Sequence, residues 1–400
     1  MRDERLSVML FTHCIVRGGA EEHMLMLASR LDQRYFRVCL ACPPALADRF
    51  RQDVPAHVEL IAVDLTKPTQ LSAMWQLANI LRNRRIDILH SHIFFSSLVA
   101  TPVGWLSGVP VIVESAHGRE AWRKGWKDHY YIDRMIGRLV DAYIAVSAAN
   151  ARYLVDVKGY PADKISVIHP GSDLSRFDPR HEAPAGLRES VGVSEGDPVI
   201  VMVGRLEPQK GHRILLEAMP AVRQRFPRVR LVCAGEGVLR SELENQTRSL
   251  GLEETVRFVG YPPDIRDWLA LATITVLPSF YEGMPVTPVE SLACQRAVVA
   301  TAVDGTPEVV LDGKTGLTVP PGDPTRLAEA ICKLLGDRDL RDTLARQGRQ
   351  WVMENFTVSQ MVARIERFYW TVWQRCAGNA AQARKVSIPG EAATSRGGVL

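Results

Sequence analysis

Ile274-Thr-Val-Leu277 leads through Pro278-Ser-Phe-Tyr-Glu-Gly-Met-Pro285 and Val286-Thr-Pro-Val-Glu-Ser-Leu-Ala-Cys294 to Ala297-Val-Val-Ala300. Two apolar runs of strand length flank an amphipathic stretch of helical period, with a glycine turn before it and proline early in the helix. Strand, helix and strand in this order predict a βαβ unit, in which the two strands lie parallel. The stretch therefore predicts an α/β fold.

The same cycle of short apolar run, turn and amphipathic stretch repeats on both sides of this unit. Further strands are expected at residues 8–11, 38–41, 59–63, 86–90, 109–114, 142–146, 165–168, 199–203, 229–233 and 256–259. A segment rich in proline, glycine and charge, residues 178–198, separates the two series and contains a short helix. We expect two Rossmann-like parallel-sheet domains, residues 1–175 and 176–357, facing each other across a cleft where their strands end.

The C-terminal part of the chain contains one more long helical pattern. Residues 358–375 carry apolar side chains at helical spacings and are long enough to reach back and pack on the first domain. The tail, residues 376–400, is rich in Gly, Ala and Arg without periodicity, and we expect it to be disordered.

Composition excludes several classes of protein. The net charge of +4, from 49 basic and 45 acidic residues, is spread along the chain, so nucleic acid is not an expected partner. No apolar run of about eighteen residues and no signal-peptide pattern occurs, which predicts a cytoplasmic protein. Cys39 and Cys42 form a CxxC without a second ligand pair, so we expect buried thiols and no metal site.

The loop Gly204-Arg-Leu-Glu-Pro-Gln-Lys-Gly211 follows a predicted strand and precedes a helix expected at residues 212–219. Glycines permit close backbone approach, a helix N-terminus offers unpaired N–H groups, and Arg205 and Lys210 add positive charge, which together suit a diphosphate. The alternative is that both cations are simply solvated in a loop.

Two carboxylates flank the start of the helix in the opening stretch. Glu282 falls in the loop because Gly283 and Pro285 follow it, whereas Glu290 lies within the helix. A carboxylate accepts two hydrogen bonds in fixed geometry and so suits the adjacent hydroxyls of a ribose or hexose. The alternative is a turn residue and a charge on a helix face.

Together these motifs resemble the retaining GT-B glycosyltransferases of family 4, the glycosyl transferases group 1. The resemblance covers most of the chain. It rests on Gly18-Gly-Ala-Glu21, His117-Gly118, Val146-Ser147, Pro170-Gly-Ser-Asp173, Gly204-Arg205, Lys210-Gly211, Glu282-Gly-Met-Pro285 with Glu290, Asp304-Gly-Thr-Pro-Glu308, Asp312-Gly313 and Thr315-Gly316. Asp304-Gly305 stands where the family commonly has Gly-Gly.

The resemblance implies a role for each matching residue. Arg205 and Lys210 would bind the donor diphosphate in place of a metal ion, Glu290 the ribose, and Glu282 the hydroxyls of the transferred sugar. His117 would lie beside the reacting carbon. The remaining donor contacts would be Gly18, Gly19, Gly283, Met284, Pro285 and Val286, with no cofactor beyond the nucleotide sugar.

The resemblance thus implies a metal-independent, retaining hexosyltransferase. It would use a nucleoside-diphosphate sugar, UDP favoured over GDP, and a glycan or lipid-linked acceptor in cell-envelope, exopolysaccharide or glycolipid synthesis. The alternatives are an inactive nucleotide-sugar binding protein of the same fold, or a glycoside hydrolase that uses Glu282 and Glu290 as acid and base. The aromatic and basic segment Trp122–Tyr131 suits peripheral contact with the inner face of a membrane, or else an ordinary exposed loop.

Overall fold

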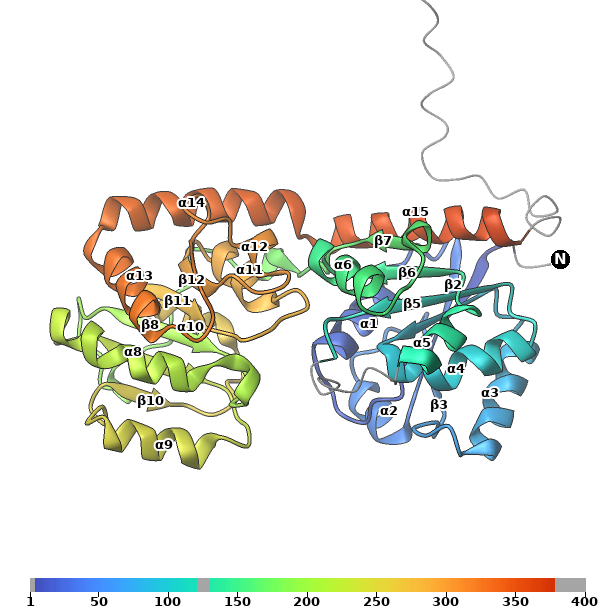
Figure 1. Cartoon of the computed structure of the whole chain (residues 1–400), viewed down its shortest axis with the longest axis horizontal. Coiled ribbons are helices and arrows are strands. Elements are labelled where there is room, and N and C mark those ends of the chain that lie inside the picture. Colours follow the sequence, from blue (N-terminus) through green and yellow to red (C-terminus); the bar gives the residue numbers. More distant parts are fainter. Residues whose placement is uncertain (1–3, 121–129, 378–400) are drawn as a thin grey trace, which may run out of the picture. The chain divides into compact units, whose positions relative to one another are not determined.

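The computed structural model describes residues 4–120 and 130–377, and the chain divides into two units. Unit 1 comprises Met1–His169 with Ser359–Leu400, and unit 2 comprises Pro170–Val358. Most of the Trp122–Tyr131 segment and nearly all of the 376–400 tail lie outside the described residues, so the expectations for both stay predictions. Figure 1 shows the red helix α15 (Val358–Cys376) beside the blue and green elements of unit 1.

In unit 1 a parallel sheet has the strand order β3-β2-β1-β4-β5-β6-β7. Its strands are β1 (Leu6–Phe11), β2 (Phe36–Cys42), β3 (Glu59–Ala62), β4 (Ile88–His92), β5 (Val111–Ala116), β6 (Ala142–Ala145) and β7 (Ile165–Val167). The helices besides α15 are α1 (Gly19–Arg30), α2 (Pro44–Phe50), α3 (Leu71–Asn83), α4 (Phe94–Leu106), α5 (Tyr130–Gly137) and α6 (Ala148–Asp156). All residues of β1, β4 and β5 are buried, as expected of strands covered on both faces.

In unit 2 a second parallel sheet has the order β10-β9-β8-β11-β12-β13. Its strands are β8 (Val199–Val203), β9 (Arg230–Ala234), β10 (Val256–Phe258), β11 (Ile274–Leu277), β12 (Ala297–Thr301) and β13 (Leu317–Val319). The helices are α7 (Leu187–Ser190), α8 (His212–Arg225), α9 (Arg240–Ser249), α10 (Ile265–Leu271), α11 (Val286–Ala293), α12 (Thr306–Val309), α13 (Pro324–Gly336) and α14 (Arg338–Asn355).

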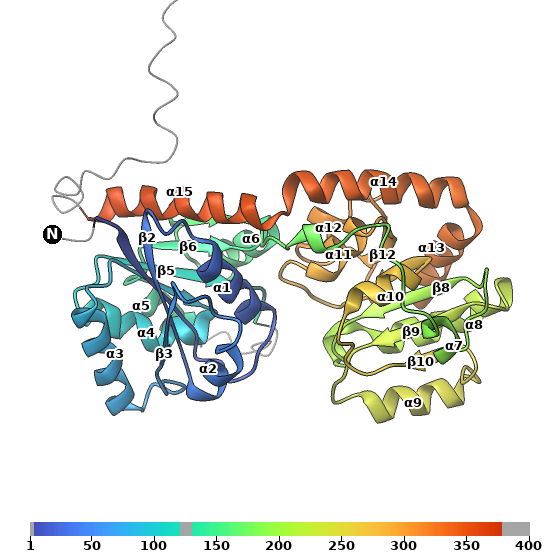
Figure 2. The ribbon, with the colours of Figure 1, turned by 180° about the vertical axis from the view of Figure 1, so that it is seen from behind.

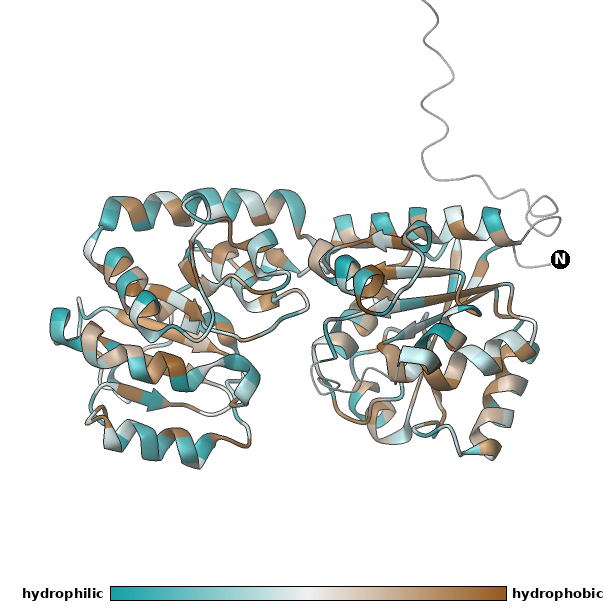
Figure 3. Ribbon diagram, viewed as in Figure 1, coloured by the Kyte–Doolittle hydropathy of each residue, from teal (hydrophilic) through white to brown (hydrophobic). Residues whose placement is uncertain are grey.

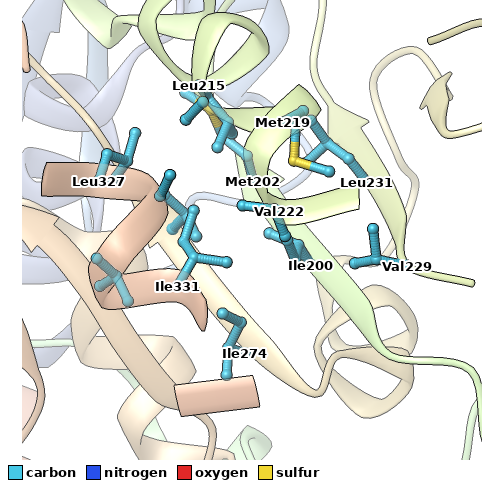
Figure 4. Close-up of a cluster of buried hydrophobic side chains, with 14 of the residues drawn as sticks. Ile200, Met202, Leu215, Met219, Val222, Val229, Leu231, Ile274, Leu327 and Ile331 are labelled. Carbon is cyan, nitrogen blue, oxygen red and sulfur yellow. The ribbon is translucent and has the colours of Figure 1, made fainter. Parts of the chain in front are cut away.

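The core of unit 2 lies where α8 and α13 cover the sheet. Figure 4 shows Leu215 and Met219 of α8 with Ile331 of α13 against Ile200 and Ile274 of the strands, all at most 1% exposed. Buried apolar area of this kind contributes about 25 cal/mol per Å². In Figure 3 the strands are mainly brown, whereas α9 and α14 are largely teal. Apolar burial therefore stabilises the sheet of unit 2, and the loops of the candidate site begin at the ends of its strands.

The predicted strands match the observed ones within a few residues, with two informative shifts. Strand β4 and strand β5 each begin and end two residues later than expected. Ile86 and Val109 instead donate their N–H groups to Leu81 and Gly104, after Arg85 and Gly108 with positive φ. This is the hydrogen-bond pattern of a Schellman helix end, whose closing residue is apolar. As a result His92 belongs to a strand, and β5 ends directly before His117.

The helix expected at residues 212–219 was predicted too short. Helix α8 continues through Pro220 to Arg225, because Val222 continues its buried face.

Within residues 4–120 and 130–377, no helix combines the length and the apolar character that a membrane span requires.

Candidate active site

In unit 2, the loops after β8 and β11 meet at the point where the strand order reverses. These strands are neighbours although they are not consecutive in the chain, and ligands of open α/β sheets bind at such points. The Phe280 N–H donates to the Gln209 carbonyl at 2.8 Å, and the Gln209 side-chain amide donates to the Tyr281 carbonyl at 2.9 Å. The two motifs therefore form one structural group.

Glycine is required where these loops touch. Gly211 has φ +72°, and a Cβ added there would lie 2.0 Å from the Pro278 carbonyl oxygen. Gly235, after β9, has φ +155°, and its Cβ would lie 2.0 Å from the Gly204 oxygen. Any side chain at either position would push the loops apart, so these glycines fix the backbone that carries Lys210.

The structure brings Lys210 and Glu282 together. The Lys210 ammonium (Nζ) lies 2.7 Å from Glu282 Oε1, and the same oxygen accepts a hydrogen bond of 2.7 Å from the Ser279 hydroxyl. Glu282 is 6% exposed, so its charge needs these partners. Its backbone N–H donates to Asp304 Oδ2 at 2.9 Å.

Asp304 is a residue whose role the sequence did not reveal. It has φ +42°, a left-handed conformation that Asp tolerates better than most residues, and its carboxylate holds the Glu282 backbone. The sequence signal for this role is Asp304 itself, in place of the usual first glycine, because its side chain can accept a hydrogen bond that glycine cannot.

Arg205 lies on the same loop as Lys210 but outside the Lys210–Glu282 pair. Its guanidinium donates to Glu207 Oε1 at 2.7 Å, and its side chain is 64% exposed. Arg205 is thus an exposed cation on the loop surface, whereas the ion pair with Glu282 holds Lys210 in place.

Glu290 lies within α11, as the fifth residue of the helix. Burial among protein atoms raises the pKa of the Glu290 carboxyl to about 8, and the positive charge of Arg176 offsets part of this effect. Met284 is buried, Pro285 directly precedes α11 and Val286 begins it. The first N–H groups of a helix lack intrahelical acceptors, so this end of α11 suits an anionic ligand.

Unit 1 also has a loop where its strand order reverses, between β1 and β4. Helix α1 begins at Gly19 with Gly18 as the residue before it. A Cβ at Gly19 would meet no atom within 4 Å, so packing does not explain the glycine at this position. His13 bonds Ser96 of α4 through Nδ1 at 2.9 Å and thereby ties the loop to the first turn of α4.

Four imidazoles gather at the same edge of unit 1, and we call them the His tetrad: His23, His90, His92 and His117. His92 Nδ1 lies 3.1 Å from His117 Nε2, and the ring centroids of His23 and His117 lie 5.2 Å apart. His90 and His92 have centroids 4.4 Å apart.

The His tetrad is uncharged at neutral pH. Burial lowers the pKa of His23 to about 4 and, with the nearby His23, that of His90 to about 3. Burial and the neighbouring imidazoles also hold the pKa values of His92 and His117 well below the usual value of 6.5. His117 can therefore accept or donate a hydrogen bond, but does not act as a cation.

His92 and His23 were missed as neighbours of His117 in the sequence. The signal was the strand itself: β4 and β5 pair in parallel, with His92 opposite Ser115, two residues before His117. Ile93 follows with φ +72°, a rare conformation for a β-branched residue that costs on the order of 1–3 kcal/mol. Such strain concentrates at functional sites.

Helix α15 supports the tetrad from the C-terminal part of the chain. The Tyr369 hydroxyl lies 2.6 Å from His90 Nδ1, and Ser115 Oγ lies 2.8 Å from His90 Nε2. Glu366 accepts a hydrogen bond of 2.8 Å from the Asp32 backbone N–H. These contacts dock α15 on unit 1.

Two family models match the chain: Glycosyltransferase Family 4 over residues 17–176, and Glycosyl transferases group 1 over residues 186–351. The D-inositol 3-phosphate glycosyltransferase of Salinispora arenicola is 31% identical over 402 residues, covering 88% of this chain and 87% of that protein. A GDP-mannose-dependent alpha-(1-6)-phosphatidylinositol monomannoside mannosyltransferase of Mycolicibacterium smegmatis is 32% identical, over 66% of this chain and 71% of its own length.

Solved structures share the fold. The Anabaena protein Alr3699/HepE in complex with UDP-glucose superimposes with a TM-score of 0.78 at 22% identity, over 92% of this chain and 100% of that one. WaaG, a glycosyltransferase involved in lipopolysaccharide biosynthesis, has a TM-score of 0.69 at 17% identity, over 93% of this chain and 100% of that one. The chain belongs to glycosyltransferase family 4, is a sugar transferase, and has the GT-B fold of two Rossmann-like domains.

Proposed function

We propose that the chain is a retaining hexosyltransferase that uses a nucleoside-diphosphate sugar, with UDP favoured over GDP. The acceptor is a glycan or lipid-linked saccharide of cell-envelope, exopolysaccharide or glycolipid synthesis. The observation that carries the proposal is the Lys210–Glu282 pair of 2.7 Å, beside the start of α11, where β8 and β11 end. It supplies a fixed cation and a fixed carboxylate where ligands of such sheets bind.

Unit 2 holds the donor in this proposal. Lys210 and Arg205 bind the diphosphate, and the end of α11 with Gly283, Met284, Pro285 and Val286 supplies backbone contacts. Glu282 receives hydroxyls of the transferred sugar, and Glu290 receives the ribose. Charge grows on the diphosphate as the glycosidic bond loosens, so cations fixed beforehand stabilise the transition state more than the ground state.

The two cations also make a metal ion unnecessary in this proposal. A diphosphate needs positive charge beside its oxygens. Lys210, held by a Glu282 carboxylate that Ser279 also bonds, supplies that charge without a metal. Transfer should therefore continue in EDTA. A loss of transfer in EDTA that Mg²⁺ or Mn²⁺ restores would refute metal independence alone.

Unit 1 supplies Gly18, Gly19 and His117 in this proposal. The space around Gly19 lets the backbone approach a donor, and the neutral His117 accepts or donates a hydrogen bond at the reacting sugar. The bond from the anomeric carbon to the diphosphate breaks, and the acceptor oxygen bonds that carbon on the same face, so no enzyme nucleophile is required. A phosphate oxygen of the departing diphosphate takes the proton of the acceptor hydroxyl.

The relatives support a nucleoside-diphosphate donor but differ in the base. The Anabaena structure contains UDP-glucose, whereas the mycobacterial mannosyltransferase is GDP-mannose-dependent. Stereochemistry is tested by incubating the full chain with α-linked UDP- and GDP-hexoses and a panel of glycoside acceptors, and then reading the anomeric proton coupling of the product by NMR. An α-linked product is expected; a β-linked product would exclude retention.

Two alternatives have different outcomes. An inactive binding protein would bind the nucleotide sugar without releasing nucleoside diphosphate. A hydrolase would need Glu282 or Glu290 as a proton donor to the leaving oxygen. Glu282 Oε1 already accepts from both Lys210 and Ser279, an arrangement suited to a permanent acceptor. Release of free sugar from glycosides without any nucleotide donor would favour the hydrolase.

A lipid-linked acceptor would bring the protein to the inner face of a membrane. We propose Trp122–Tyr131 as one contact, from its mixture of aromatic and basic residues. Its test is the vesicle experiment described below, which separates this segment from other surfaces of unit 1.

A further inference from the structure

Helices α3, α4 and α5 lie next to one another and expose large apolar side chains to solvent. Figures 1 and 2 show them on one side of the unit 1 sheet, with α15 on the other, and Arg82 at the end of α3 donates to the Leu106 carbonyl at the end of α4. The exposed apolar residues are Leu71 (74%), Trp75 (70%), Phe95 (38%), Trp105 (58%), Leu106 (69%), Tyr131 (68%), Ile132 (48%) and Met135 (63%). We call this surface the α3–α5 face.

On α3 and α5 the exposed apolar residues follow the helical repeat, and on α4 they lie at the two ends of the helix. Leu71 and Trp75 are four residues apart on α3, as are Tyr131 and Met135 on α5. In Figure 3, α3 carries more brown than the solvent-facing helix α9. Large apolar side chains that gather on adjacent helices and remain exposed to water are typical of an interaction site, so this surface indicates a partner.

The exposed charged side chains carried by the three helices are all positive. The sequences of α3, α4 and α5 contain a single carboxylate, Asp133, which is buried and lies 3.0 Å from the Lys158 ammonium. The exposed charged residues of these helices and their ends are Arg82, Arg85, Arg134 and Arg138. Nothing acidic on the three helices opposes an anionic partner.

We propose that the α3–α5 face docks on an anionic bilayer surface. Tryptophan and tyrosine favour the boundary between headgroups and acyl chains, where their rings are apolar and their N–H or O–H groups remain hydrated. Arginines beside them attract anionic headgroups. A second copy of this chain would bring these arginines against one another without a carboxylate to pair them, so charge favours the bilayer. The proposal does not depend on the catalytic assignments.

The test is flotation of the purified full chain with vesicles of phosphatidylcholine and phosphatidylglycerol, and with vesicles of phosphatidylcholine alone. Wild-type protein should float with the anionic vesicles and much less with neutral ones, and high salt should weaken the binding. The double variant Trp75→Gln/Trp105→Gln should bind about tenfold more weakly, because two apolar side chains no longer enter the interface.

A second variant tests the charge. Arg85→Asn/Arg138→Gln should lower binding to anionic vesicles by about 25-fold, since each arginine near an anionic surface contributes about fivefold, and should leave weak binding to neutral vesicles unchanged. Asparagine is chosen because residue 85 has φ +49°, which asparagine tolerates. The matched control, Met353→Gln/Arg326→Gln, changes an exposed apolar residue and an exposed arginine of unit 2 and should bind as wild type.

Three outcomes would overturn the proposal. In the first, both variants of the α3–α5 face bind vesicles as wild type does, whereas Trp122→Gln/Trp126→Gln abolishes vesicle binding. That result would assign docking to the segment Trp122–Tyr131. The second is equal binding to neutral and anionic vesicles. The third is a dimer in sedimentation velocity that Trp75→Gln/Trp105→Gln dissociates, without vesicle binding, which would make the face a contact between copies.

Discussion

Lys210 and Glu282 show how the site is stabilised before any ligand arrives. An almost buried carboxylate is costly unless it is paired, and Glu282 has both an ammonium and a hydroxyl at 2.7 Å. The same contact orients the lysine, whose flexible side chain would otherwise sample many rotamers. In the proposed function, stability and donor binding both depend on this one pair of side chains, and variants can separate the two effects.

Lys210→Met should lower both stability and turnover. It leaves Glu282 buried without its counter-charge, so the free energy of unfolding should fall by about 2–3 kcal/mol. The double variant Lys210→Met/Glu282→Gln should regain part of that stability while kcat/KM stays reduced by about a hundredfold, by analogy with removing one oxyanion donor. Urea unfolding and donor kinetics measure the two effects. A double variant with wild-type kcat/KM would show that the pair is only structural.

Gly19→Ala should leave the fold intact and impair the enzyme. A methyl group at this position meets no atom within 4 Å, and alanine is a better helix former than glycine at the start of α1. Thermal unfolding should therefore be unchanged or slightly higher, while KM for the donor rises. The control is Gly336→Ala in α13, whose added methyl makes an ordinary contact of 3.6 Å with Phe226. If KM is the same for both variants, the donor does not approach Gly19.

The His tetrad combines residues of α1 and β4 with His117 after β5. Their positions follow from the parallel register, which brings the ends of neighbouring strands to one edge of the sheet. Because His23 and His90 have folded pKa values of about 4 and 3, against 6.5 when unfolded, the unfolded chain takes up protons first as pH falls. Their contribution to stability is therefore fully present above pH 6.5 and is lost as pH falls toward those values.

His23→Leu tests this pH dependence. Wild-type protein should lose stability between pH 6.5 and pH 5, of which His23 accounts for about 1–2 kcal/mol. The leucine variant should lose correspondingly less, since it lacks the titrating imidazole. Among the described residues Nδ1 of His23 has no hydrogen-bond partner, so the substitution breaks no hydrogen bond to that atom. Urea unfolding at several pH values measures the slopes. Parallel slopes for the two proteins would mean that His23 is protonated in the folded state as readily as in the unfolded one.

The elements differ in how far sequence predicts them. Apolar runs located β8 and β11 with their observed bounds, because strands buried on both faces have few polar residues. The start of β4 was misplaced, since the apolar Ile86 closes the preceding helix. The three-residue β13 was not predicted, because Pro320 ends its apolar pattern, whereas β7 and β10, equally short, each continue into a further apolar residue.

The candidate site was predictable at the level of loops and not of atoms. Motifs after neighbouring parallel strands must share one edge of the sheet, so Lys210 and Glu282 were expected near one ligand. Their direct contact and the Asp304 hydrogen bond depend on rotamers and on a left-handed turn. The partnership of His92 with His117 was hidden because the predicted strand ended at residue 90.

Both units contain a parallel sheet whose strand order reverses, and in both the loops of the candidate site lie at the reversal. In unit 1 the loop carries Gly18 and Gly19, and in unit 2 the loops carry Arg205, Lys210 and Glu282. Family membership makes the chain a sugar transferase. In the proposed function, unit 2 binds the diphosphate of the donor. Substitutions at the diphosphate site of unit 2 should therefore change the affinity for the donor.

Calorimetric titration of UDP and GDP into the full chain in EDTA tests that assignment directly. Wild-type protein should bind UDP, and Lys210→Met should weaken the Kd by about tenfold to a hundredfold, the value of one hydrogen bond to a charged group. Arg213→Met is the matched control: this exposed cation lies three residues further along and pairs with Glu242 on α9. Arg213→Met should bind UDP with wild-type affinity. Equal UDP affinity for Lys210→Met and wild type, or no heat with either nucleotide, would contradict the assignment of the diphosphate to Lys210.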